Sequence, residues 1–471
     1  MNRTPEQQTI VSHVESTEGL TLVDSIAGSG KTTLLVDIST SIPHTNGLYL
    51  AYNRSVATEA ARKFPKTTHC LTTHAMAYQA VVKRYKLTLG TFGYKNITEP
   101  VAYEQKCLVS DHMRSFCLSS YTTFTEYAKV NELAAITVTL SSKYLGLMQT
   151  GAIECTHEFY LKYFHVLLAD GTLTYDPFDF IMLDEAGDLN EVTLAIFLLL
   201  PSPRKIAVGD KHQNIYQFNE TINCFNVLHG QGTLLKMTQS FRVSSHIATK
   251  IEAFCHSYLD PNMQFRGVPL TDKSIRTRAF LTRTNGALIA RMIVLNEKSI
   301  PYGLLRRPQE IFKVPLMLCS LKYQGFITDP AYKFIQADID EWYESQVLKE
   351  NYKNVLSYLA FLYSKDVQLT QAIRLLQRYG KATIIDTYEE ARKHTKADQS
   401  YILATCHSCK GAEFDEVTIA DDLNDTADEA VSKLSAGYSL DELTQAERES
   451  LNLYYVAVTR AAKELYNAKH L

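Results

Sequence analysis

The chain has 471 residues and a formal net charge of −3 at pH 7. At about 100–200 residues per domain this length predicts three or four domains, and the near-neutral charge alone does not indicate a nucleic-acid partner, although a basic groove can lie on a neutral protein. The nine cysteines are scattered, which predicts reduced thiols in a cytoplasmic or nucleoid-associated protein. No signal peptide is evident and every apolar run is shorter than the roughly 20 residues of a membrane span, so we expect no membrane partner.

Short apolar runs rich in β-formers alternate with helical stretches along the chain, a pattern typical of parallel α/β layers. Two regions, near 84–160 and 300–390, show helical spacing instead, and residues 352–379 read as one or two amphipathic helices. We therefore predict two α/β cores, each interrupted by a mainly helical insertion. The predicted strands are 20–25, 47–52, 180–183, 205–208, 278–282, 401–405 and 416–420.

The first predicted strand leads into a glycine-rich turn and a helix, LTLVDSIAGSGKTTLLVDI. Gly28 and Gly30 let the backbone close so that its N–H groups and the helix N-terminus face phosphate oxygens. Lys31 is then expected to reach the β- and γ-phosphates of ATP, and Thr32 to hold Mg²⁺. The alternative is an ordinary glycine-rich turn between strand and helix. The predicted nucleotide contacts here are Ser25 (a small residue where the usual pattern has glycine), Gly28, Ser29, Gly30, Lys31, Thr32 and Thr33.

A second acidic signal follows the strand predicted at 180–183, in the segment FDFIMLDEAGD. Asp184 at a strand end is typical of a carboxylate that holds Mg²⁺ through water, and Glu185 beside it can orient and deprotonate an attacking water. The alternative is a solvated acidic turn.

Cys406 and Cys409 form a CxxC, but no second pair stands at zinc-site spacing, so we expect no metal there.

Further segments stand in a fixed order between residues 4 and 465: TPEQQ, LAYNRS, TTHAMAY, VGDKHQNIYQFN, LLKMTQSFRVSSHIA, FLTRTNGALI, ATCHSCKGAEFDEV and NLYYVAVTRAAKEL. Together they resemble the motifs of the UvrD/Rep/PcrA branch of superfamily 1 helicases. The stretch LAYNRSVATEAARKFPKTTHCLTTHAMAY is most similar to the F-box DNA helicases, here without an F-box segment. In this resemblance, Cys406 and Cys409 occupy variable positions within the segment ATCHSCKGAEFDEV.

The resemblance implies roles around ATP. Gln7 is expected to hydrogen-bond the adenine edge, Phe241 to stack on the adenine, and Glu413 to contact the ribose. Gln213 is expected to sense the γ-phosphate and link it to DNA. Arg283 and Asn285 stand at matching motif positions.

Two arginines, Arg242 and Arg460, are implied to reach the γ-phosphate from the second core. A guanidinium there can accelerate phosphoryl transfer by about 10³–10⁵-fold. ATP binding is then expected to close the two cores and hydrolysis to reopen them, which moves DNA stepwise.

The resemblance also implies a single-stranded DNA path. Aromatic stacking tolerates any sequence and contributes roughly 1–3 kcal/mol per base. The bland alternatives are that Tyr52, Tyr216 and Phe218 are core aromatics and that His74 is a buried, satisfied imidazole. The implied DNA contacts are Tyr52, Asn53, Thr73, His74, Tyr216, Phe218, Thr405 and His407.

The chain departs from the family pattern at two places. Gly187 replaces a glutamine expected to couple ATP state to neighbouring motifs, and Asn219 replaces an arginine after the second stacking aromatic. These changes favour, as an alternative to a helicase, a non-unwinding DNA-dependent ATPase that serves as motor or switch subunit of a recombination, replication or defence complex. A metabolic P-loop kinase would need neither the second arginine nor the aromatic motif.

The resemblance implies an α/β fold with two RecA-like P-loop cores of parallel sheets, and a 3′-to-5′ polarity because Lys410–Gly411 stands where the opposite branch has Gln–Gly. The partners implied are single-stranded DNA, tailed or forked duplexes and proteins of replication or recombination, and we expect a monomer able to self-associate. The chain ends soon after the last motif, so no C-terminal nuclease is expected. The predicted first core is 1–83 and 161–230 with insertion 84–160; the second is 231–300 and 390–471 with insertion 301–389.

Overall fold

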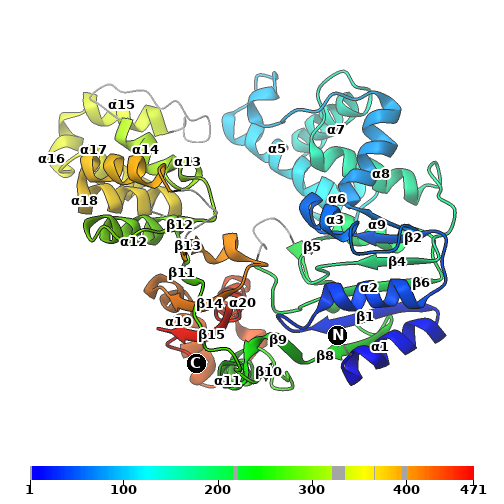
Figure 1. The fold of residues 1–471 in the computed structure, drawn as a ribbon. Coiled ribbons are helices and arrows are strands. Elements are labelled where there is room, and N and C mark those ends of the chain that lie inside the picture. Colours follow the sequence, from blue (N-terminus) through cyan, green and yellow to red (C-terminus); the bar gives the residue numbers. More distant parts are fainter. Residues whose placement is uncertain (1–2, 216–220, 321–334, 365, 395–399) are drawn as a thin grey trace. The chain divides into compact units, whose positions relative to one another are not determined.

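The computed structural model describes residues 3–215, 221–320, 335–364, 366–394 and 400–471. The chain divides into two compact units, Met1–Phe241 and Arg242–Leu471 (Figure 1). Each unit is built on its own parallel sheet with helices packed against it. The division falls after Phe241, which is later than the boundary at residue 230 predicted from the sequence.

The first unit contains a parallel sheet of six strands in the order β3-β2-β4-β6-β1-β8. The strand after residue 230 belongs to this sheet because it pairs with β1 from Thr21 to Ser25. A two-residue antiparallel pair, β5 (Leu189–Asn190) with β7 (Thr221–Ile222), lies beside it. The bounds are β1 Gly19–Ser25, β2 Gly47–Leu50, β3 Thr68–Leu71, β4 Phe180–Leu183, β6 Arg204–Gly209 and β8 Thr233–Met237.

Alternate residues of the central strands enter two separate cores, as the period of a β-strand requires. On β4, Met182 joins one core together with α1 (Pro5–Ser16) and α2 (Lys31–Ser41). Its neighbours Ile181 and Leu183 join the other. Both faces of the sheet are therefore covered, which explains why these strands read as continuous apolar runs.

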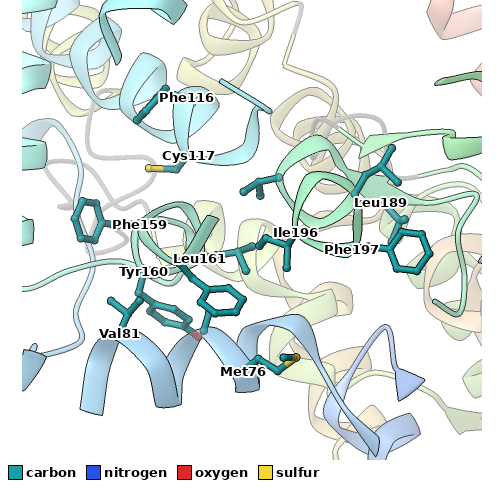
Figure 2. Packing of buried hydrophobic residues seen from close by; sticks show 14 of the residues in the cluster. Met76, Val81, Phe116, Cys117, Phe159, Tyr160, Leu161, Leu189, Ile196 and Phe197 are labelled. Atoms are coloured by element: carbon teal, nitrogen blue, oxygen red, sulfur yellow. The ribbon is translucent and has the colours of Figure 1, made fainter. Parts of the chain in front are cut away.

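The second of these cores is formed with the helical segment of the first unit. Leu161 of α8 lies next to Ile196 of α9, and Phe159, Phe197 and, from α5, Phe116 and Cys117 belong to the same cluster (Figure 2). The segment predicted as an insertion is therefore helical and continuous with the core of its unit. The helices are α3 Arg54–Ala60, α4 Thr73–Ala77, α5 Tyr103–Leu118, α6 Phe124–Val130, α7 Ala135–Gln149, α8 His157–Ala169, α9 Glu191–Leu199 and α10 Cys224–Val227, with a π-helical turn at Tyr78–Lys83 and a 3-10 turn at Tyr94–Asn96.

The second unit contains a parallel sheet of five strands in the order β12-β13-β11-β14-β15. A short two-stranded sheet, β9 (Gln239–Ser244) with β10 (Arg266–Val268), stands apart from it. The bounds are β11 Arg278–Thr282, β12 Gly303–Leu304, β13 Tyr401–Thr405, β14 Phe414–Ile419 and β15 Ala461–Tyr466.

A helical layer also covers the second unit. Ile289 and Met292 of α12, Leu359 of α17 and Ile373 of α18 share one core with Leu403 of β13. The helix α18 is broken at Gly380, whose φ is 77°. The helices are α11 Ser245–Tyr258, α12 Asn285–Glu297, α13 Pro308–Ile311, α14 Lys313–Ser320, α15 Gln336–Glu344, α16 Gln346–Asn351, α17 Val355–Leu362, α18 Val367–Ala391, α19 Asp421–Ser435 and α20 Gln445–Val458, with 3-10 turns at Cys406–Cys409 and Leu440–Glu442.

The fold class predicted from the sequence is confirmed: two parallel sheets, each with an added helical layer. All seven predicted strands are present within a few residues of their predicted bounds, although Tyr52 and Ala420 fall outside them. Within the described ranges, no helix is both long and apolar enough to cross a bilayer.

Candidate active site

The loop between β1 and α2 has the geometry of a phosphate-binding turn. Gly28 and Gly30 have φ values of 72° and 81°, in the left-handed region that favours glycine. Ser25, at the end of β1, is fully buried and its hydroxyl donates to the carbonyl oxygen of Gly209 at 2.8 Å. This hydroxyl therefore anchors the base of the loop to β6, while the loop backbone and the N-terminus of α2 supply the donors for an anion.

Two side chains converge on this loop at Gly30. A Cβ added there would lie 3.3 Å from Nε2 of Gln7, tighter than most contacts, and at an ordinary contact distance of 3.6 Å from the ring of Phe241, so both side chains border Gly30 closely. The Gln7 amide contacts the carbonyl of Ser29 at 3.4 Å, and Gln7 also closes the capping box of α1 with Thr4. The backbone N–H of Phe241 donates to the Gly28 carbonyl at 2.8 Å.

The two residues predicted to flank adenine therefore lie beside the loop, from opposite ends of the first unit's sequence. Gln7 is buried, whereas 46% of Phe241 is exposed. A large aromatic face open to solvent next to a phosphate loop is suited to stacking on a planar ring.

Asp184 and Glu185 lie at the end of β4, next to Lys31. The Nζ of Lys31 is 3.9 Å from an oxygen of Glu185. Asp184 is buried and accepts two hydrogen bonds, from the Glu185 N–H at 2.9 Å and from the Tyr49 hydroxyl at 2.6 Å. Burial and then the neighbouring Glu185 raise the pKa of Asp184, while burial and Asp184 raise the pKa of Tyr49. The alternative reading of this segment, a solvated acidic turn, therefore does not hold for Asp184.

These residues fit a magnesium ion. Mg²⁺ is usually held by one or two carboxylates together with substrate phosphates and water. Asp184 supplies one buried carboxylate whose charged form a cation would favour, and Thr32 is the second residue of α2, directly after Lys31. No group of three or more His, Cys, Asp or Glu in the described parts of the chain is placed to hold a metal, so the phosphates of a nucleotide would have to complete the shell.

Glu185 has a left-handed backbone, with φ of 53°. Such a conformation is uncommon for a residue with a side chain and is found where the surroundings impose it, often at functional sites. The turn is closed by the Asp188 N–H, which donates to the Glu185 carbonyl at 3.0 Å. The turn brings the Glu185 side chain to 3.9 Å from Lys31, whereas Asp184, the first residue after β4, remains tied to β2 through its N–H, which donates to the Leu50 carbonyl.

Gly187 packs directly on the loop that carries Gln213. A Cβ at Gly187 would lie 2.3 Å from the carbonyl oxygen of Asp210, so there is no room for a side chain. Gln213 is buried and its amide donates to the Asp210 carboxylate at 2.8 Å. The glycine that departs from the family pattern is therefore required by the packing of this chain.

The residues predicted to contact DNA in the first unit are placed differently from one another. Tyr52 is 48% exposed, so the core-aromatic alternative is wrong for it. The Asn53 side chain caps α3 by accepting from the Val56 N–H, and Thr73 is buried at the start of α4. His74 is half-buried against the ring of Tyr160, at 5.9 Å, and burial lowers its pKa. Tyr216, Phe218 and Asn219 lie outside the described residues.

In the second unit, the turn after β13 carries the other predicted DNA contacts. Thr405 is buried and its hydroxyl donates to Ser408 at 3.1 Å, while His407 is half-buried. Cys406 and Cys409 are free thiols, both fully buried, and donate to the backbone carbonyls of Leu453 and Cys406. These two cysteines therefore contribute to local packing.

Arg242 and Arg460 lie near each other in the second unit. Arg242 pairs with Glu413 at 2.8 Å, so the residue predicted to contact ribose here holds an arginine. Arg460 is 1% exposed and donates to the carbonyls of Val456 and Ala412 and to the Thr459 hydroxyl. Burial and then the charge of Arg242 lower the pKa of Arg460. Among the described residues no carboxylate forms an ion pair with Arg460. Its buried guanidinium is hydrogen-bonded only to neutral oxygen atoms, so no anionic side chain compensates its positive charge there.

Sequence reasoning did not single out Tyr49, whose hydroxyl bonds Asp184, or Asp210, which orders the Gln213 amide. Tyr49 has a detectable signal, because it sits in the middle of an apolar strand where a phenol hydroxyl needs a buried partner. Asp210 stands inside a recognised motif between Gly209 and Gln213.

Comparisons with known proteins agree with this geometry. A family model described as an AAA domain matches residues 7–219, and one described as a UvrD-like helicase C-terminal domain matches residues 326–470. The chain is 26% identical to the F-box DNA helicase protein 1 of Schizosaccharomyces pombe, over 98% of this chain and 57% of that protein. It is 25% identical to the F-box DNA helicase 1 of Gallus gallus, over 99% of this chain and 49% of that protein.

The chain thus spans about half the length of the curated relatives it matches. The two family models follow one another in the same order as the two sheets, and the phosphate loop with Asp184 lies within the AAA match, whereas Arg460 lies within the helicase match. The chain therefore carries an AAA domain followed by a UvrD-like helicase C-terminal domain, and over nearly its whole length it is similar to F-box DNA helicases.

Proposed function

We propose that this chain is an ATP-dependent DNA helicase that translocates 3′-to-5′ along single-stranded DNA. The proposal is carried by two features of one chain: a phosphate loop with two strand-end carboxylates in the first unit, and in the second a buried arginine that forms no ion pair with a carboxylate of the described residues. The relatives named DNA helicases support DNA as the substrate.

In the proposed reaction, the loop from Gly28 to Lys31 binds the phosphates of ATP, and Gln7 and Phe241 hold the adenine. Asp184 and Thr32 would hold Mg²⁺, which supplies charge neutralisation on the phosphates. Glu185 acts as the base that orients the attacking water. Its place within 3.9 Å of Lys31 suits it to a water beside the γ-phosphate.

The arginines of the second unit act on the transferred phosphate. Burial makes the charge of Arg460 costly where it stands, and the nearby Arg242 adds repulsion. An anion beside Arg460 would offset this cost, and a guanidinium at the γ-phosphate accelerates phosphoryl transfer by about 10³–10⁵-fold. Hydrolysis followed by dissociation of the inorganic phosphate would remove that anion and release the second unit, which gives one step of movement per ATP.

DNA is proposed to run past the exposed Tyr52 and the turn that carries His407, with Tyr216 and Phe218 stacking on bases. The polarity rests on the similarity of the segment around Lys410 to the 3′-to-5′ branch. Tailed or forked duplexes and proteins of replication or recombination are the proposed partners.

The test is steady-state ATP hydrolysis with and without single-stranded DNA, alongside unwinding of duplexes that carry either a 3′ or a 5′ tail. We expect stimulation by DNA and unwinding only from the 3′ tail. Lys31→Ala should abolish the stimulated activity, and activity that persists in this variant would overturn the site assignment.

Stimulation without unwinding from either tail would instead favour the second candidate, a DNA-dependent ATPase that works as a subunit of a larger complex. Unwinding only from the 5′ tail would keep the helicase and reverse the proposed polarity. No ATP hydrolysis in any condition would overturn both candidates.

A further inference from the structure

A tyrosine outside the predicted site residues contacts the proposed magnesium carboxylate. The hydroxyl of Tyr49, on β2, donates to Oδ2 of Asp184 at 2.6 Å. Tyr49 has no exposed surface and Asp184 has 5%. The contact therefore lies inside the first unit and is shielded from competing water.

The sheet places these two residues on the same face. Tyr49 is level with Met182 on the neighbouring parallel strand β4. Asp184 follows Met182 by two positions, so strand alternation returns it to the face that Tyr49 occupies. The Tyr49 ring packs on Phe64 at 4.7 Å between centroids, which fixes the direction of the hydroxyl toward the strand end.

The bond leaves the carboxylate able to bind a cation. An ionised carboxylate offers about four lone-pair sites on its two oxygens. The Glu185 N–H takes one site on Oδ1 and Tyr49 takes one on Oδ2. Each oxygen keeps one site, and the two fixed donors set the plane in which those remaining sites lie.

We infer that Tyr49 is a positioning residue that orients Asp184 for the magnesium ion of the ATP site. This inference rests on the proposed function, because it assumes that Asp184 holds Mg²⁺ with a nucleotide. Partners that orient a metal ligand usually change metal affinity or activity by about 10–100-fold when they are removed. The expected effect is on metal affinity, with the nucleotide contacts of the loop left intact.

The experiment compares the full chain with Tyr49→Phe, which keeps the ring on Phe64 and removes only the hydroxyl. Mn²⁺, which takes the same oxygen ligands as Mg²⁺, is titrated into the ADP-bound chain and followed by electron paramagnetic resonance. We expect Tyr49→Phe to weaken Mn²⁺ binding about 10-fold or more, while ADP binding without metal stays unchanged. The Mg²⁺ concentration for half-maximal ATP hydrolysis should rise by the same factor, with kcat restored at saturating Mg²⁺.

The matched control is Tyr144→Phe, which also removes a hydroxyl that a buried tyrosine donates to a carboxylate, here Glu99 at 2.7 Å in the helical layer. It should leave Mn²⁺ affinity unchanged. If Tyr49→Phe does not fold, Tyr49→Met fills the same space without a hydroxyl and takes its place. In an Asp184→Asn background, Tyr49→Phe should cause no further loss, because the two residues act through one bond.

Unchanged Mn²⁺ affinity in Tyr49→Phe would overturn the inference, as would a fall in kcat that saturating Mg²⁺ does not restore. The metal titration needs neither DNA nor unwinding. A chain that fails to unwind but shows the Tyr49 effect therefore contradicts only the helicase proposal, and an active helicase without the effect contradicts only the role of Tyr49.

Discussion

Gly187 offers a sharp test of the packing between the carboxylate turn after β4 and the loop after β6 that carries Asp210 and Gln213. The change is Gly187→Ala. The added Cβ would lie 2.3 Å from the carbonyl oxygen of Asp210 and 3.0 Å from its carbonyl carbon, both backbone atoms that no side-chain rotation can move. Overpacking of this kind costs about 1–3 kcal/mol. For a unit of this size each kcal/mol lowers Tm by about 2–4 °C, so we expect the first unit to melt about 2–12 °C lower.

The matched control is Gly146→Ala, in the helix α7. An added Cβ at Gly146 meets nothing within 4 Å, and alanine in a helix interior is more stable than glycine by about 1 kcal/mol. The two substitutions are chemically identical and should shift Tm in opposite directions. Scanning calorimetry of the whole chain measures both. Equal shifts, or no fall in Tm for Gly187→Ala, would refute the close contact.

Gly187→Gln extends the same test to activity, because it introduces the side chain that the family pattern places there. We expect it to lower DNA-stimulated ATP hydrolysis, since the loop of Gln213 would have to move away from its Asp210 contact. A variant with stronger stimulation than the unmodified chain would show that position 187 accepts a coupling side chain.

Three further results are expected. Arg460→Met should lower kcat for ATP by about 10³–10⁵-fold with single-stranded DNA affinity nearly unchanged; lost DNA binding with a normal kcat would contradict its role. Burial, with a smaller effect of Lys162, lowers the pKa of His165 from 6.5 to about 4. As pH falls, this histidine is protonated in the unfolded chain before it is protonated in the folded chain. The folded state therefore loses stability between about pH 6.5 and about pH 4. At about 1.36 kcal/mol per pKa unit the loss approaches roughly 3 kcal/mol, and urea melts of His165→Gln should lack this slope; an identical slope would exclude His165 as its source. Affinity for single-stranded DNA, followed by fluorescence anisotropy, should fall steeply with salt as counterions are released, and a flat response would count against a phosphate-tracking groove.

The strands that can be predicted from the sequence lie in the interior of the two parallel sheets, whereas the strands that cannot be predicted lie at their edges. Every predicted strand lies inside a sheet, whereas β3, β8, β12 and β15, which were not predicted, are the edge strands. An interior strand is covered on both faces and reads as an apolar run. The edge strand β8 exposes Thr233, Leu234 and Lys236, so its sequence carries no regular burial signal. Because β8 pairs with β1, the first compact unit extends to Phe241.

The candidate site divides in a similar way. The phosphate loop and Asp184 are predictable because each is a local pattern, a strand followed directly by glycines or by carboxylates. The contact of Tyr49 with Asp184 cannot be predicted in this way, because the two residues are 135 positions apart and only the order of the strands in the sheet brings them together. The pairing of Arg242 with Glu413 is hidden for the same reason, since the two residues are 171 positions apart.

Two departures from the family pattern, Ser25 in the phosphate loop and Gly187 in the carboxylate turn, are explained by one set of backbone contacts. Ser25 at the end of β1 donates to Gly209 at the end of β6. A Cβ on Gly209 would lie 2.7 Å from the Gly187 nitrogen, and Gly187 in turn abuts Asp210. Three strand ends thus meet where only small residues fit, and the serine adds a hydrogen bond that glycine lacks. The phosphate loop, the carboxylate turn and the Gln213 loop are consequently fastened to one another through main chain, so a movement forced on one of them by a nucleotide must displace the others.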